Sequence, residues 1–347
     1  GGVIASAASE ALLALAEKTN IPVTTTLLGL GGFPETNKLS LGMLGMHGTA
    51  YANYTITNSD CIIAIGARFD DRITGRIDEF APNAQIIHID IDPTSISKNI
   101  KVHIPVVGDA KMILEELNKY VKFIERKEWM EQVNAWKAKH PLAYSDSGDG
   151  IKPQYIIEQI CKVAGEDAII TTDVGQHQMW TSQYYTFTKP RTFLTSGGLG
   201  TMGFGFPAAI GAQLAFPGRN VICISGDGSF QMNLQELSTA VFNKIPVKVA
   251  ILDNGFLGMV RQWQDLFFNK RYSNTCLKGN PDFVKIAEAY GATGFLIEKK
   301  EDVTPVLKKA LEIDGPVVMD FKTVPDENVY PMVPAGEAIH RMIDGMA

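Results

Sequence analysis

Two polar side chains follow two neighbouring predicted strands, and their chemical types suit a metal ion. Asp227 lies in a Gly-Asp-Gly turn after the apolar run 221–224, and Asn254 follows the apolar run 247–252. Helix-like residues 234–243 lie between the runs, so the sequence predicts a βαβ unit with parallel strands. Because the carboxyl ends of adjacent parallel strands open into one crevice, we expect Asp227 and Asn254 to meet there.

The chemistry expected of this pair is metal and phosphate binding. A carboxylate and an amide oxygen beside glycine-rich backbone suit Mg²⁺, which keeps phosphate oxygens among its ligands. A diphosphate cofactor would fit such a site. Considered by itself, the turn at Asp227 has a simpler interpretation, because Gly-Asp-Gly after a strand is commonly only a tight turn. The second half of the pattern, at Asn254, favours the metal site.

The pattern along the chain supplies the strands that these residues need. Helical and strand patterns alternate and predict an α/β fold with two doubly wound parallel-sheet domains. We expect one domain at 1–121, a linker at 122–150 and a second domain at 151–347. No Gly-x-Gly-x-x-Gly fingerprint follows a strand, which argues against a nicotinamide site. The expected elements are helices at 9–18, 110–120, 154–163, 282–291 and 303–313, and strands at 22–26, 61–66, 85–92, up to 109, 168–172, 294–298 and 316–322.

Composition excludes several classes of protein. The 347 residues are 45% apolar and 20% charged, which is typical of a globular chain with two domains. The formal net charge of −6 argues against a nucleic-acid partner, because there is no basic stripe to neutralise phosphates. No apolar run is long enough to span a membrane. The four cysteines lack metal-ligand spacing and are expected to be reduced core thiols.

Several other side chains keep two interpretations when their residue types are considered alone. The charged group at 66–72 suits either a structural salt-bridge corner or an arginine grip on phosphate. The amide-rich backbone at 173–180, before a predicted helix, offers N–H donors to an anion, and His177 within it suits either a structural or capping role or a catalytic one. Met202 suits plain core packing, the common role of a methionine. Residues 41–48 are interpreted as a flexible, glycine-punctuated loop.

Four strings of the sequence resemble those of acetohydroxyacid synthase (acetolactate synthase), a family of thiamin diphosphate (ThDP) enzymes. LGMHG at 44–48 and GARFDDRITG at 66–75 are similar to its FAD-domain signatures. GQHQMW at 175–180 and GMVRQWQ at 258–264 are similar to its ThDP and substrate-channel segments. The resemblance covers essentially the whole chain, and it implies a central FAD-binding domain followed by a ThDP diphosphate-binding domain.

The resemblance implies three cofactors, ThDP, Mg²⁺ and FAD, and a set of residues for each. Asp227, Asn254 and the backbone carbonyl of Phe256 would bind Mg²⁺. The residues implied at ThDP are Val174, Gly175, Gln176, His177, Gly200, Gly226, Gly228, Ser229, Leu257 and Gly258. The residues implied at FAD are Gly2, Thr26, Leu27, Met46, His47, Gly66, Ala67, Arg68, Asp70, Asp90, Ile91, Asp109, Ala110, Gln178 and Met179.

Five further residues are implied in catalysis or substrate binding. Met202 would wedge under ThDP and force its bent shape, which brings the aminopyrimidine nitrogen within reach of the thiazolium proton. Trp263, with Met259 and Val260 beside it, would line the substrate channel and favour a larger second 2-oxo acid. Arg72 would hold the carboxylate of that second substrate.

The resemblance also implies a reaction and an assembly. Pyruvate is decarboxylated and joined to pyruvate or 2-oxobutanoate, in the synthesis of isoleucine and valine. The chain is expected to be a fragment without the amino-terminal pyrimidine-binding domain, and without the first strand of the central domain. In the family that missing domain carries the activating glutamate and comes from the partner subunit. We therefore expect the chain alone to be inactive and to bind ThDP weakly.

The expected partners are 2-oxo acids, a second copy in a dimer or tetramer with active sites between subunits, and a regulatory small subunit. The expected location is the cytoplasm, as in bacteria, with a plastid as the alternative. Two other functions stay open. One is a related ThDP enzyme, a pyruvate oxidase or a 2-oxo acid decarboxylase, against which the 68–75 string and Trp263 argue. The other is a non-catalytic cofactor-binding module.

Overall fold

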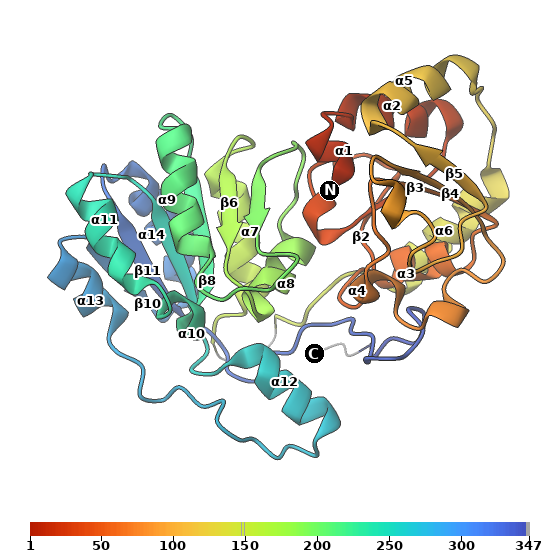
Figure 1. The fold of residues 1–347 in the computed structure, drawn as a ribbon. Helices are drawn as coiled ribbons and strands as arrows, with labels where there is room; N and C mark the ends of the chain where they lie inside the picture. Colours follow the sequence, from red (N-terminus) through yellow and green to blue (C-terminus); the bar gives the residue numbers. More distant parts are fainter. Residues whose placement is uncertain (147, 149, 345–347) are drawn as a thin grey trace. The chain divides into compact units, whose positions relative to one another are not determined.

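The structure is a computed structural model that describes residues 1–146, 148 and 150–344. It contains two compact units (Figure 1). The first consists of Gly1–Ala143, Thr186–Arg191 and the described residues from Tyr330 onward, and the second of Tyr144–Tyr185 and Thr192–Val329. Positions 147 and 149 of the expected linker and 345–347 of the expected second domain lie outside the described residues.

The units divide the chain differently from the expected ranges 1–121, 122–150 and 151–347. The helix α6 (Lys127–Lys139), inside the expected linker, belongs to the first unit. Its Val133 is fully buried with Leu41 and Ala52, and Trp129 and Trp136 pack against the same cluster. The tryptophans of this charged stretch therefore form part of a hydrophobic core.

All strands of the first unit pair in parallel. One pair is β1–β2, and a second sheet has the order β3-β4-β5. The strands are β1 (Val23–Thr25), β2 (Ser40–Met43), β3 (Cys61–Ile65), β4 (Gln85–Asp90) and β5 (Ile104–Val107). Besides α6, the helices are α1 (Gly2–Ala5), α2 (Ser9–Thr19), α3 (Ala50–Thr57), α4 (Asp71–Thr74) and α5 (Ala110–Tyr120), with short 3-10 turns at Leu27–Gly29, Ile77–Glu79 and Pro93–Ser95.

Local sequence explains where several of these elements begin and end. Asp109 caps α5 by accepting hydrogen bonds from the backbone N–H groups of Lys111 and Met112. α2 ends at Asn20, which adopts the left-handed conformation that asparagine tolerates. The interpretation of 41–48 as a flexible loop was wrong at its start, because alternate residues Leu41 and Met43 are buried and form β2.

The second unit has one sheet of six parallel strands in the order β10-β11-β9-β8-β6-β7. The strands are β6 (Ile169–Thr172), β7 (Phe193–Thr195), β8 (Val221–Gly226), β9 (Lys248–Asp253), β10 (Thr293–Ile297) and β11 (Val317–Lys322). The helices are α7 (Pro153–Ala164), α8 (Gln176–Tyr184), α9 (Gly205–Ala215), α10 (Asp227–Phe230), α11 (Leu237–Phe242), α12 (Gly258–Phe267), α13 (Phe283–Tyr290) and α14 (Lys300–Glu312), with a 3-10 turn at Leu234–Glu236.

Helices cover both faces of this sheet. α9, α11 and α13 pack on one face, and α7, α8 and α14 pack on the other. The core between the sheet and the first set contains Val221, Val249, Phe206 and Phe283, all essentially without solvent contact. Strands buried on both faces explain the continuous apolar runs of the sequence. The expected α/β fold with parallel sheets is confirmed.

Two expectations from composition have different outcomes. Cys223 is buried in β8, but Cys61 and Cys276 are exposed, so their expected place in the core was wrong. Cys61 is the first residue of β3, where the strand is still open to solvent. Within the described part of the chain, no helix has the length and apolar character needed to cross a membrane, and no cluster of three or more His, Cys, Asp or Glu side chains could hold a metal.

Candidate cofactor and substrate site

The βαβ unit brings the expected metal ligands to one place. β8 pairs with β9 in parallel, and Gly226 lies opposite Leu252 in the register. Asp227 directly follows the last residue of β8, Asp253 is the last residue of β9, and Asn254 directly follows it, so all three lie at the same edge of the sheet. Asp227 and Asn254 line one cavity, together with Phe256.

Nearly all residues expected at ThDP line this cavity, which we call the strand-end cavity. Gly200 lies outside the lining, where the nearest side chain to a Cβ added to it is that of Val174. Trp180 and Leu252 line it although the sequence did not suggest them as contacts. The expected lining residues are Val174, Gly175, Gln176, His177, Met202, Gly226, Gly228, Ser229, Leu257, Gly258, Met259 and Val260.

Asp227 is a buried carboxylate whose charge is only partly offset. Its side chain accepts a hydrogen bond from Asn280 Nδ2 at 2.6 Å, and only 1% of the residue is exposed. Burial, with the nearby charge of Asp253, raises the pKa of Asp227 to about 7. Asp253 forms an ion pair with Lys322, which also pairs with Asp320. A divalent cation beside Asp227 would relieve this concentration of negative charge.

A buried amide network holds Asn254. Asn254 donates to Gln176 Oε1 at 3.3 Å, and its own Oδ1 accepts from the backbone N–H of Phe256 at 3.0 Å. Gln176 donates in turn to Gln262 Oε1 and to the carbonyl of Glu327, both at 2.9 Å. The side chain of Glu327, 4% exposed as a residue, pairs with Lys152 and accepts from Gln154. The amide oxygen of Asn254 is thereby held on the same edge of the sheet as Asp227.

Glycines let the backbone come close to these side chains. A Cβ on Gly258 would lie 2.0 Å from Gln176 Oε1, and one on Gly226 would lie 2.9 Å from His177 Nδ1. A Cβ on Gly228 would lie 2.7 Å from the Leu257 side chain. Because such distances are far below van der Waals contact, a larger residue at any of these positions would force the side chains of Gln176, His177 or Leu257 to move.

His177 is a neutral, buried group in this lining. Burial lowers the pKa of His177 to about 3. Among the described residues, none forms a hydrogen bond with His177 Nε2 or with the indole nitrogen of Trp180, although both atoms are buried. Unsatisfied buried polar atoms are uncommon and call for an explanation such as a ligand. Together with the oxygen atoms of Asp227, Asn254 and Phe256, these two nitrogen atoms fit a site for Mg²⁺ and a diphosphate.

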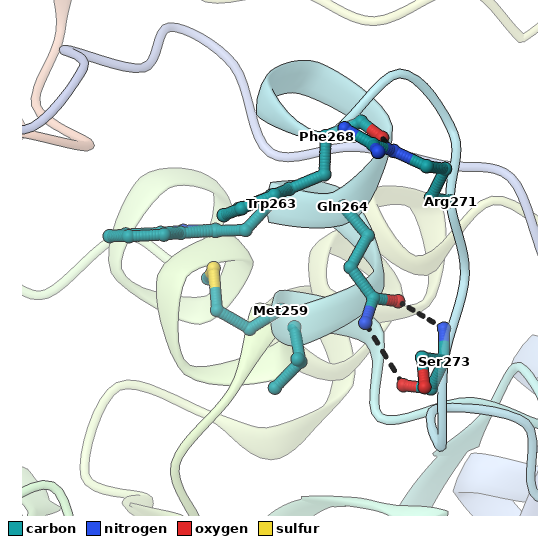
Figure 2. A pocket seen from close by; sticks show the side chains of 7 residues that line it. Met259, Trp263, Gln264, Phe268, Arg271 and Ser273 are labelled. Atoms are coloured by element: carbon teal, nitrogen blue, oxygen red, sulfur yellow. Dashed lines mark hydrogen bonds between the residues drawn. The ribbon is translucent and has the colours of Figure 1, made fainter.

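A second cavity lies along α12 and has a volume of about 500 Å³. Met259 and Trp263 extend from this helix to the same side, and Gln264 reaches across to Ser273 (Figure 2). Met259 and Val260 line both this cavity and the strand-end cavity. The mainly apolar lining and the volume are those of a small-molecule site. Its lining residues are Met259, Val260, Trp263, Gln264, Phe268, Arg271 and Ser273.

In the first unit, the two strings that resemble FAD signatures contact each other. The backbone N–H of Met46 donates to the carbonyl of Arg72 at 2.8 Å, and a Cβ on Gly45 would lie 2.3 Å from that same carbonyl oxygen. Arg72 Nη1 lies 3.7 Å from the sulfur of Met46. His47 is buried beside them, and burial lowers its pKa to about 4.

The other residues expected at FAD in the first unit lie at the carboxyl ends of strands or at helix starts. Gly2 and Gly66 contact each other, since a Cβ on either would lie 2.5 Å from the other's Cα. Arg68 pairs with Asp70 at 2.7 Å. Gln178 and Met179 lie on α8 of the second unit. In chain order, the residues expected at FAD in the first unit are Gly2 in α1, Thr26 and Leu27 after β1, Met46 and His47 after β2, Gly66, Ala67, Arg68 and Asp70 after β3, Asp90 and Ile91 at the end of β4, and Asp109 and Ala110 before or in α5.

Sequence reasoning missed the polar partners of the metal ligands. Asn280 and Glu327 have no recognisable spacing to Asp227 or Asn254, because the fold brings them together from other segments, and Gln262 was part of a quoted string but not expected in this network. Trp180 was part of a quoted string, but nothing local marks it as a cavity residue. Only the three-dimensional arrangement identifies these side chains.

Comparison with known proteins decides the family. Residues 1–117 match the central domain of thiamine pyrophosphate enzymes, and residues 173–321 match their C-terminal TPP binding domain. The chain belongs to the thiamine pyrophosphate enzyme family. The domain order and the strand-end cavity of the second unit agree with this assignment.

The relatives are acetolactate synthases, so the expected resemblance is confirmed. One from Mycobacterium bovis is 50% identical over 97% of this chain and 56% of its own length. The large subunit from Haemophilus influenzae is 47% identical, covering 99% of this chain and 61% of the relative. The isozyme 3 large subunit from Escherichia coli is 45% identical with the same coverage. The chain therefore spans little more than half the length of these relatives.

Proposed function

We propose that this chain forms the central and ThDP-binding domains of an acetolactate synthase large subunit. The observation that carries the proposal is the convergence of Asp227 and Asn254, from adjacent strands, on one cavity with unsatisfied buried polar atoms. The names of the relatives support this reaction over that of a pyruvate oxidase or a 2-oxo acid decarboxylase.

The proposed reaction is a decarboxylation followed by a carboligation. The bond between the carboxylate and carbonyl carbons of one pyruvate breaks, and CO₂ leaves. A new bond forms to the carbonyl carbon of a second pyruvate or of 2-oxobutanoate, whose oxygen takes up a proton. The products are 2-acetolactate and 2-aceto-2-hydroxybutanoate, without net oxidation or reduction. ThDP, when bound, supplies an electron sink for the carbanion.

The chain's own residues would bind and orient the reactants. Asp227, Asn254 and the carbonyl of Phe256 would hold Mg²⁺ on the diphosphate. Because its pKa is about 3, His177 is neutral at physiological pH and adds no charge beside that diphosphate. Met202, whose terminal methyl lies 3.9 Å from a Cβ added to Gly228, would hold the cofactor bent.

The cavity along α12 is the proposed place of the second 2-oxo acid. Trp263 with Met259 and Val260 provides an apolar surface for its alkyl group. Met259 and Val260 are shared with the strand-end cavity, so the two reactants would meet at these side chains. The family resemblance also assigns the carboxylate of the second substrate to Arg72, a guanidinium that can bind a carboxylate bidentately.

FAD, assembly and location complete the proposal. The residues at the strand ends of the first unit, such as Arg68 and Asp109, would bind a structural FAD. The words "large subunit" in the names of relatives support a regulatory small subunit as partner. Assembly as a homodimer or tetramer and a cytoplasmic location are carried over from the family resemblance.

Calorimetry tests the proposal. We expect ThDP to bind in the presence of Mg²⁺ and to bind much more weakly in the presence of EDTA, and we expect bound flavin absorbance after reconstitution with FAD. Retained flavin without Mg²⁺-dependent ThDP binding would instead indicate a non-catalytic flavin module. ThDP binding without flavin would favour another ThDP enzyme, and product analysis with pyruvate plus 2-oxobutanoate would identify it.

A further inference from the structure

A long loop connects α12 with α13 in the second unit (Figure 1). Its residues 273–280, which we call the bridging segment, form no helix and only one isolated β-bridge, between Cys276 and Phe256. Thr275 within it is 3% exposed. The segment is therefore partly buried although it lacks regular structure, and its backbone groups must find partners elsewhere.

The partners on one side are in the loop after β9. The N–H of Leu257 donates to the carbonyl of Thr275, and the N–H of Leu277 donates to the carbonyl of Gly255, both at 2.8 Å. These two bonds enclose Phe256, whose carbonyl is a proposed Mg²⁺ ligand. The bridging segment thus fixes the backbone that presents this carbonyl.

The start of the segment is bound to α12 by one side chain. Gln264 Nε2 donates to the carbonyl of Ser273 at 2.9 Å, and Gln264 Oε1 accepts from the hydroxyl of Thr275 at 3.2 Å (Figure 2 shows the contacts to Ser273). Gln264 and Ser273 also line the cavity along α12. The same segment therefore borders the proposed substrate cavity.

The end of the segment contacts the other metal ligand. Asn280 Nδ2 donates to Asp227 Oδ2 at 2.6 Å, a charge-assisted hydrogen bond when the carboxylate is ionised. Asn280 Oδ1 accepts from Gln231 Nε2 at 2.8 Å, and Gln231 Nε2 also contacts the Asp227 carbonyl at 3.1 Å. The amide of Asn280 is thus oriented from one side so that its donor group faces the carboxylate on the other.

We propose that Asn280 is a positioning residue for Mg²⁺: by holding Asp227 Oδ2 it sets the rotation of the carboxylate and leaves the other oxygen for the metal. The inference rests on the proposed function, in which Asp227 binds Mg²⁺. Groups that orient metal ligands commonly change metal affinity by about 10- to 100-fold when they are removed. The bridging segment then contacts two of the three proposed protein ligands, Asp227 through Asn280 and Phe256 through its backbone neighbours.

Two substitutions distinguish a role of Asn280 in positioning Asp227 from a role in filling space. Asn280→Ala removes the donor and leaves a gap, whereas Asn280→Leu removes the donor and keeps a similar volume. We expect both to weaken Mg²⁺ binding at saturating ThDP by about 10-fold or more in calorimetry. If Asn280 only fills space, the alanine variant should bind Mg²⁺ more weakly, and the leucine variant should bind it with wild-type affinity. Wild-type affinity in the leucine variant therefore overturns the proposal.

Matched variants keep the test independent of folding. Asn274→Gly removes the same kind of side chain from an exposed position of the segment with left-handed backbone, φ 55°, and we expect unchanged Mg²⁺ affinity. Gln231→Leu leaves Asn280 in place but removes the bond that orients it, and we expect about 3-fold weaker Mg²⁺ binding. If the Asn280 variants do not fold, as judged by circular dichroism, unchanged affinity in Gln231→Leu overturns the proposal.

The outcome for the wild-type chain distinguishes the two proposals. Absence of Mg²⁺-dependent ThDP binding by the wild-type protein overturns the proposed function, and this inference with it. Mg²⁺-dependent binding that is equally strong in Asn280→Ala and the wild type overturns the role of Asn280 alone.

Discussion

Polar residues stand at strand ends in both units, but their surroundings differ. In the second unit Asp227 is 1% exposed, and His177 Nε2 is buried and has no hydrogen-bond partner among the described residues. In the first unit the Arg68 side chain is 65% exposed and pairs with Asp70, and Asp109 caps a helix. A buried carboxylate and a buried ring nitrogen without a hydrogen-bond partner call for a counter-charge or a ligand, whereas an exposed ion pair does not. The strand ends of the second unit are therefore the better candidates for a ligand site.

Removal of the charge at Asp227 should have the largest effect. We expect Asp227→Asn to weaken Mg²⁺-dependent ThDP binding by about 100-fold or more, because a proposed ligand of the metal loses its charge. The same change should raise the stability of the ligand-free chain at pH 8, since a buried carboxylate near Asp253 becomes neutral. Calorimetry and urea unfolding measure the two effects. Asp302→Asn, at an exposed position in α14, is the control, and equal binding by both variants would exclude Asp227 as a ligand.

A glycine substitution in the first unit should affect its fold and leave the second unit's site intact. Gly45 has φ 102°, and an added Cβ would lie 2.3 Å from the Arg72 carbonyl oxygen. We expect Gly45→Ala to lower the free energy of unfolding of the first unit by about 3 kcal/mol. Tryptophan fluorescence in a Trp180→Phe, Trp263→Phe background, which keeps only Trp129 and Trp136 of the first unit, reports the unfolding of this unit. Gly211→Ala, with no atom within 4 Å of the added Cβ, is the control. A loss of ThDP binding in Gly45→Ala would contradict the expectation that the effect is confined to the first unit.

The pH dependence of the first unit should reveal Glu35. Burial raises the pKa of Glu35 from its usual 4.5 to about 7, although the N–H of Phe187 donates to its carboxylate. A raised folded-state pKa contributes stability below pH 4.5 that is lost as the pH rises through about 7. We expect Glu35→Gln to be more stable than the wild type by about 2 kcal/mol at pH 8, and equally stable at pH 4.5.

Urea unfolding at the two pH values, again followed by Trp129 and Trp136, measures the effect of Glu35. Glu131→Gln, at an exposed position on α6, is the control and should leave the pH dependence unchanged. A Glu35→Gln variant with the pH dependence of the wild type would show that Glu35 is already ionised in the folded chain.

The smallest effect on stability is expected at Arg68. Since its ion pair with Asp70 is exposed, Arg68→Ala should change the free energy of unfolding by less than about 1 kcal/mol. If Arg68 grips the FAD phosphate, flavin affinity should fall by about 10-fold in fluorescence titrations. Arg76→Ala, which removes another exposed ion pair of the first unit, provides the comparison. Equal flavin affinity in the two variants would remove Arg68 from the FAD site.

Most elements of the second unit could be predicted from the sequence, because the apolar residues in them recur with a clear period or form continuous runs. Helix α5 of the first unit was predicted with both ends correct, and the βαβ unit around Asp227 and Asn254 has the expected parallel and adjacent strands. The strands β2 and β7 were missed, and β2 contains Gly42, which favoured the interpretation of this stretch as a glycine-punctuated loop. Contacts such as that of Asn280 with Asp227 could not be predicted, because they depend on how a loop without regular structure packs.

The strand order of the second unit also has a consequence for synthesis of the chain. β11, the last strand to be made, inserts between β9 and β10. Until residue 322 has left the ribosome, β9 is an open edge that can pair with another chain. Lys322, the ion-pair partner of Asp253, arrives at the same moment. The binding edge of the sheet is therefore completed only at the end of translation of this unit, and a nascent chain arrested before Val317 would expose both an unpaired strand and an unpaired carboxylate.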